Sequence, residues 1–286
     1  MMNFIESVIE YGFLQKALIT SVMVGVICGV IGCFIILRGM ALMGDAISHA
    51  VLPGVAISYI LGINFFIGAV VTGVLTAVGI GFISQNSRVK NDSAIGIVFT
   101  AAFALGIIMI TLLKSSSDLY HILFGNVLAV RPSDMWITLI IGIIVLASVY
   151  LFYKELLVSS FDPIMAQAYG LPTKMIHYFL MTLLTLVTVA SLQTVGIILV
   201  VAMLITPAST AYLLTNRLSI MIALSALFGT ISAIGGLYLS FTYNLASGAT
   251  IVLVATALFI LSFIFSPKQG VLWKSIQTRK SKSIVG

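Results

Sequence analysis

The sequence predicts an all-α, polytopic membrane protein whose 286 residues form a single transmembrane domain of eight or nine helices. Hydrophobic residues make up 60% of the chain, charged residues make up only 8%, and the mean hydropathy is +1.21. A soluble domain carries roughly 25% charged residues because its surface must be hydrated. The apolar residues also fall in runs of the roughly 20 residues that one helix needs to cross a bilayer. These observations exclude a disordered chain, a secreted disulfide scaffold and a nucleic-acid-binding protein.

Nine hydrophobic segments are the candidate spans. Very little polar sequence separates the second from the third, near Gly62, or the sixth from the seventh, near Gln193. Either pair could therefore form one merged or re-entrant segment, which leaves the number at eight or nine. The first span contains Gly25-x-x-x-Gly29, a spacing that lets helices in lipid approach closely. In chain order the spans cover roughly residues 13–37, 40–61, 63–84, 94–113, 134–153, 175–192, 194–214, 219–240 and 247–265.

The basic residues orient the chain, because the cytoplasmic loops of membrane proteins are enriched in lysine and arginine. Such residues lie in the loops at 85–93 and 154–174 and in a basic tail at about 267–286. If these three segments are cytoplasmic, the 114–133 segment and a short N-terminal segment at about 1–12 lie outside. The net charge of +6 then reflects topology and contact with anionic membrane lipid rather than an acidic partner.

An ionisable side chain within an apolar span is costly and therefore calls for a functional hypothesis. Asp45 and His49 are four residues apart, so they share one helix face, with Cβ atoms about 6 Å apart. Such a carboxylate and imidazole pair can ligate a divalent first-row metal. Pro53 and Gly54 follow one turn later, where a kink would expose backbone carbonyls or make room for a path. In the alternative interpretation, Asp45 caps a helix at the cytoplasmic interface and His49 only hydrogen-bonds to it.

Two other sets of polar residues are weaker candidates. Asp118 and His121 are three residues apart and could also face one way, but the topology places them in an external segment, where charge is cheap. They are predicted either to contact the cation at an external gate or to form the solvated face of a gating or docking helix. His177 follows Lys174 at the start of a span and is predicted to be interfacial.

The loop between the fifth and sixth spans contains a short helix of its own. Asp162 at the N-cap and Pro163 at the first helical position predict its start, and Gly170 predicts its end. The small side chains of Ala166 and Ala168 would leave a surface that another protein could approach closely. The alternative is an ordinary surface helix with no partner.

Several motifs are absent from the sequence. No GxxxxGK[ST] phosphate-binding loop occurs, so the chain is not expected to bind ATP in that way. Neither HExxH nor GxSxG occurs, which disfavours an intramembrane hydrolase.

Several stretches together resemble one family, the membrane-spanning subunits of bacterial ABC importers for manganese, zinc and iron. The resemblance covers nearly the whole chain, except for the first dozen residues and the tail after Pro267. Its most specific element is Gly-Asp-x-x-x-His-Ala, which begins at Gly44. The matching segments are LRGM at 37–40, GDAISHAVLPG at 44–54, LFGNVLAV at 123–130, VGIILV at 195–200, TPASTA at 206–211 and SGATIVL at 247–253.

The resemblance implies a multi-pass permease of the bacterial cell membrane with the fold of the cobalamin-importer type. It implies a homodimeric pore, two cytoplasmic ABC ATPase subunits that bind and hydrolyse the ATP, and an extracellular metal-binding lipoprotein that delivers the cargo. The permease itself would be no enzyme and would hold no permanent cofactor. Asp45 and His49 match the positions at which the family binds the cation in transit. The positions that match the family's coupling element for the ATPase are Asp162, Pro163, Ala166 and Gly170.

The cargo is expected to be manganese first, with iron and zinc less favoured. No cysteine lies near Asp45 and His49, which disfavours a thiolate site, and the YNLASGA stretch at 243–249 is similar to that of manganese members. One alternative is a stand-alone secondary transporter that is driven by protons through the same pair. Others are an ABC permease for a metal chelate such as a siderophore, and a membrane metalloenzyme, which would lack an evident third ligand.

Overall fold

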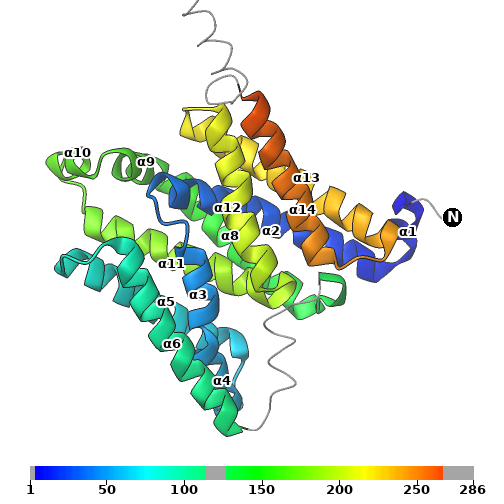
Figure 1. Cartoon of the computed structure of the whole chain (residues 1–286), viewed down its shortest axis with the longest axis horizontal. Coiled ribbons are helices and arrows are strands. Elements are labelled where there is room, and N and C mark those ends of the chain that lie inside the picture. The colour runs from blue at the N-terminus through cyan, green and yellow to red at the C-terminus, as the bar shows by residue number, and fades with distance from the viewer. Residues whose placement is uncertain (1–3, 114–126, 267–286) are drawn as a thin grey trace, which may run out of the picture.

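The computed structural model describes residues 4–113 and 127–266, and all the regular structure in these ranges is helical (Figure 1). Nine of the described segments are long and apolar enough to cross a membrane, which agrees with the larger of the two predicted numbers. The helices are α1 (Phe4–Glu10), α2 (Gly12–Leu37), α3 (Met43–Ala50), α4 (Leu52–Leu61), α5 (Phe65–Asn86), α6 (Asn91–Leu113), η1 (Val127–Ala129), α8 (Pro132–Leu151), α9 (Tyr153–Phe161), α10 (Pro163–Ala168), α11 (Thr173–Val195), α12 (Ile197–Leu214), α13 (Leu218–Tyr243) and α14 (Ser247–Phe265).

The two pairs of spans that could have merged are separate helices. α4 ends at Leu61, and the next residue, Gly62, has a left-handed φ of 66°. α5 begins after Asn64, whose side chain accepts a hydrogen bond from the Phe66 amide at 2.9 Å. Only Gly196 lies between α11 and α12, and its φ of 83° is a conformation that glycine adopts without strain. A left-handed glycine therefore stands at each of the two junctions.

Helix α2 lies at the centre of the hydrophobic core and packs against α8, α11, α12 and α13. Gly25 and Gly29 form the contact with α13. A Cβ atom added at Gly25 would lie 2.8 Å from the backbone of Gly229, and the Ser225 hydroxyl donates a hydrogen bond to the Gly29 carbonyl at 2.9 Å. The close packing that the glycine spacing predicts is thus confirmed. Figure 1 shows α5 and α6 together on the other side of the molecule from α13 and α14.

Several contacts agree with the predicted topology. The ends of α5 and α6 that flank the 85–93 loop line one cavity of about 550 Å³ together with Ser159, Ser160 and Lys174, so the two loops predicted to be cytoplasmic are neighbours. Ser266, just before the basic tail, donates a hydrogen bond to the Leu213 carbonyl near the end of α12. α13 starts beside this end of α12, and near its opposite end Tyr238 packs against the Phe4 ring of α1. Which of these two sides is cytoplasmic stays a prediction.

The contact between α2 and α13 yields a testable expectation. Gly25→Ala should lower the melting temperature of the purified protein, because the new methyl group has no room and overpacking costs about 1–3 kcal/mol. Gly96→Ala in α6 is the matched control, since no atom lies within 4 Å of its Cβ position. Thermal unfolding in detergent would check this, and equal melting temperatures for the two variants would contradict the described packing.

Candidate functional site

The second membrane span is broken into two short helices. α3 ends at Ala50, and α4 begins at Leu52 with Pro53 in its first turn, where the missing N–H of proline is harmless. The kink predicted near Pro53 is therefore confirmed. Gly54 has a different consequence from the one expected, because a Cβ atom there would collide with the backbone of Gly68 in α5. It brings α4 and α5 into close contact.

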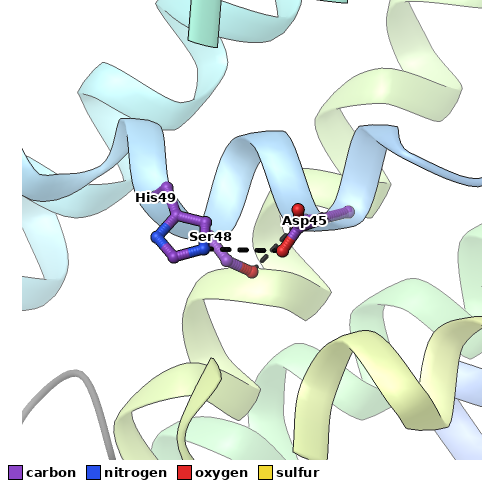
Figure 2. A network of polar contacts seen from close by, with 4 residues as sticks. Asp45, Ser48 and His49 are labelled. Atoms are coloured by element: carbon purple, nitrogen blue, oxygen red, sulfur yellow. Dashed lines mark hydrogen bonds and ion pairs between the residues drawn. The ribbon is translucent and has the colours of Figure 1, made fainter. Parts of the chain in front are cut away.

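Asp45 and His49 project from the same side of α3 (Figure 2). The Asp45 Oδ1 atom and the His49 Nε2 atom are 3.5 Å apart, and the side chains are 43% and 29% exposed on the single chain. Ser48 lies between them in sequence, but its hydroxyl donates to the Gly44 carbonyl at 2.8 Å. The structure contradicts the interpretation in which Asp45 is the helix cap, since Leu42 occupies the N-cap position and Asp45 is already in the first turn.

Two aromatic rings of α6 hold the imidazole of His49. Its ring centroid lies 5.7 Å from that of Phe99 and 5.3 Å from that of Phe103. The Nδ1 atom of His49 is buried and has no hydrogen-bond partner among the described residues. The polar contact of this ring among the described residues is therefore the one that its Nε2 atom makes with Asp45.

The geometry of the pair suits a shared cation but does not complete its coordination. Two ligands at right angles, each about 2.1 Å from one ion, are about 3 Å apart, so the Asp45 and His49 atoms need to move little to bind the same metal. Among the described residues, however, no three histidine, cysteine, aspartate or glutamate side chains are grouped closely enough to hold a metal. This part of one chain therefore offers two protein ligands.

The predicted short helix between the fifth and sixth spans is present as α10. The Asp162 carboxylate accepts hydrogen bonds from the Ile164 and Met165 amides at 3.1 and 2.9 Å, and Pro163 occupies the first helical position. Gly170 follows the helix with a φ of 77°. The sequence signals at both ends are thus confirmed, and Figure 1 shows α9 and α10 at the margin of the molecule, at the upper left.

The exposed face of α10 differs from the one that the sequence indicated. Ala168 is exposed, as expected, but Ala166 is fully buried, so the expectation that its small side chain leaves an approachable surface is wrong. Ala166 instead packs α10 against the rest of the chain. Three large apolar side chains at α10 and its C-cap are exposed, together with Gln167 and Ala168. Ile164 is 81% exposed, Met165 is 49% exposed and Tyr169 is 73% exposed.

The remaining candidates have different outcomes. Asp118 and His121 lie outside the described residues. The Nδ1 atom of His177 lies 3.4 Å from a guanidinium nitrogen of Arg38, beside the cavity that the two loops share.

Sequence reasoning missed Arg38 and the Phe99 and Phe103 pair. The aromatic pair has a signal, because two phenylalanines four residues apart share one face of α6.

Comparisons with known proteins agree with this architecture. The profile of the ABC 3 transport family matches residues 10–266. The manganese transport system membrane protein MntC of Listeria monocytogenes is 71% identical over 272 residues, which are 95% of this chain and 97% of MntC. The solved structure of PsaBC from Streptococcus pneumoniae in complex with Fab is similar, with 55% sequence identity, a TM-score of 0.84, and coverage of 93% of this chain and 96% of that one.

A more distant structure bears on the fold alone. An inward-facing metal-chelate type ABC transporter matches with a TM-score of 0.69 at 14% identity, over 92% of this chain and 89% of that one.

The family profile and the relatives of high identity show that the chain belongs to the ABC 3 transport family, as a multi-pass membrane permease of metal ABC importers. A permease of this kind is a translocation subunit.

Proposed function

We propose that this chain is the permease subunit of an ATP-driven manganese importer. Two copies form the pore, and Asp45 and His49 of both copies bind the cation in transit. The observation that carries the proposal is the exposure of this ionisable pair within the membrane span Met43–Leu61. Hydrocarbon does not solvate a carboxylate, so ionisable side chains in membrane spans face a protein interface or a water-filled path.

The second copy supplies what a single chain lacks. Around a twofold axis, two chains would offer two carboxylates and two imidazoles, which is a sufficient ligand set for a divalent first-row cation. The partial exposure of both side chains and the absence of a third acidic, histidine or cysteine ligand among the described residues both support a site completed at an interface.

Manganese is the proposed cargo, ahead of iron and zinc. The relative with 71% identity is a manganese transport protein, and carboxylate oxygen is a ligand type that suits Mn²⁺. The two cysteines offer no soft alternative. Cys28 contacts the Ser191 hydroxyl and Cys33 donates to the Gly29 carbonyl, and both are buried in α2.

The energy comes from partner proteins. We assign α10, with its cap Asp162 and its exposed Ile164, Met165 and Tyr169, to the contact with a cytoplasmic ABC ATPase. In this assignment Pro163 and Gly170 fix the ends of the helix, and Ala166 fixes its packing. An extracellular metal-binding lipoprotein delivers the ion, the pair on α3 holds it, and movement of α10 by the ATPase releases it inward.

Uptake into proteoliposomes tests the site directly. Asp45→Asn and His49→Ala should each reduce manganese uptake by at least about tenfold, because the loss of outer-shell partners alone already costs about 10–100-fold in metal affinity. The complex would contain the ATPase and the binding protein, with zinc and iron offered in competition. Normal uptake in both variants would contradict the site. Uptake by this chain alone, driven by a proton gradient, would indicate a secondary transporter, and uptake of chelated metal only would indicate a chelate permease.

Asp162 variants test the contact with the ATPase. Asp162→Lys removes the oxygen that caps α10, at a cost of about 0.5–2 kcal/mol, and should abolish co-purification of the ATPase. Asp162→Asn keeps a side-chain oxygen that accepts the same hydrogen bonds, so it should retain the ATPase. Retention by the lysine variant would remove α10 from the proposed interface.

A further inference from the structure

Arg38 joins three helices at the side of the molecule on which α10 lies. It is the residue that follows α2, and its guanidinium contacts both of the other helices. Its Nε donates to the Ser160 hydroxyl at 3.0 Å and one terminal nitrogen donates to the Ser159 hydroxyl at 2.7 Å, both in α9. The other terminal nitrogen lies 3.4 Å from His177 Nδ1 in α11. A planar guanidinium holds its donors in a fixed fork, so this arrangement sets direction as well as distance.

The partners of Arg38 are unusual for a half-buried cation. All three are neutral or weakly basic groups, and the one ion pair found among the described residues is Asp45 with His49. Burial lowers the pKa of Arg38 to about 10, so it still carries its charge at neutral pH. Keeping a charge partly out of water without a carboxylate is costly. The enrichment of cytoplasmic loops in lysine and arginine does not require burial, because an exposed residue such as Arg217 supplies the same charge without the cost of removing it from water.

One side of this connection leads directly to the metal-binding pair. Gly39, with a φ of 65°, and Met40 close the turn after α2, and the Met40 amide donates to the Ile35 carbonyl at 3.0 Å. The Met43 amide, at the start of α3, donates in turn to the Met40 carbonyl at 3.0 Å. The turn is thus tied at both ends, and Asp45 lies in the first turn of α3.

The other side leads to the proposed contact with the ATPase. Ser159 and Ser160 are in the last turn of α9, immediately before the residues that begin α10. A cavity of about 550 Å³ lies beside the connection and is lined by Met40, Ser160, Pro163, Gln167 and His177, among others. The described side chains leave this space open, so α10 has room to shift relative to α2. The hydrogen bonds of Arg38 join the end of α2 to the last turn of α9, which leads into α10.

We infer that Arg38 is a positioning residue that couples movement of α10 to the placement of Asp45 and His49. The inference rests on the proposed function. Coupling between two sites requires a segment that can adopt two arrangements, one favoured by the state of the ATPase and one by the bound cation. We assign this role to the segment from Arg38 to α3. Loss of the connection should leave ATP hydrolysis intact and reduce the amount of metal moved for each ATP.

The test uses the full complex of this chain with its ATPase and binding protein in proteoliposomes. Manganese uptake and phosphate release are measured in the same samples. Arg38→Gln should keep ATP hydrolysis within about twofold of the wild type while the manganese-to-ATP ratio falls about fivefold or more, which is the lower end of usual coupling between sites. Arg217→Gln is the matched control, because it removes an exposed arginine at the start of α13, and it should leave both quantities unchanged.

A second variant keeps the arginine and removes its partners. Ser159→Ala with Ser160→Ala is nearly isosteric, so it should fold, and it should lower the ratio as Arg38→Gln does. Combining all three changes should give no further loss, since groups in one network are not additive. An unchanged ratio, or a parallel fall of hydrolysis and uptake, overturns the inference and leaves the proposed function standing. Absence of ATP-dependent uptake by the wild-type complex overturns the proposed function and the inference with it.

Discussion

The cost of placing a carboxylate and an imidazole within a membrane span is the constraint on which the rest of this structure depends. A single chain leaves both side chains partly exposed, and its described residues supply no third acidic, histidine or cysteine ligand. The aromatic rings of Phe99 and Phe103 fix the imidazole without giving its Nδ1 atom a partner. The pair is therefore presented outward in a defined orientation, which is the form that a site shared between two copies would take.

Close packing of small residues against the surrounding helices fixes the position of α3 and α4, and with it the orientation of Asp45 and His49. Gly44, next to Asp45, lies under the side chain of Leu204 in α12, and Gly54 of α4 lies against Gly68 of α5. A larger residue at Gly54 or Gly68 would meet backbone and push α4 and α5 apart, whereas one at Gly44 would meet only the tip of the Leu204 side chain. Interior packing is dense, so even one added methylene is felt at such contacts. The hydrogen bonds of Arg38 join the end of α2 to the last turn of α9, which precedes α10.

Much of the fold could be predicted from the sequence because its signals are local. Hydropathy located the spans to within a few residues, and left-handed glycines now account for the two close junctions that hydropathy left open. The ends of α10 were predictable because Asp162 and Gly170 act on their own neighbours in the chain. The spacing of Asp45 and His49 likewise defined one helix face.

The rest could not be predicted, because it depends on contacts between distant segments. Arg38 lies 121 and 122 residues from its serine partners, and no local pattern pairs them. The burial of Ala166 depends on how α10 lies on the rest of the chain, which its own six residues do not determine. The same holds for the two phenylalanines that contact His49, since they come from another helix.

The most direct test of the central claim is the stoichiometry of Mn²⁺ bound to the purified complex of this chain with its ATPase, without the binding protein. Elemental analysis after gel filtration would give the bound metal, with Asp45→Asn prepared in parallel. A site shared across the twofold axis predicts about one ion for every two permease chains, and none in the variant. One ion per chain, or undiminished binding by the variant, would contradict a transit site built from Asp45 and His49 of both copies.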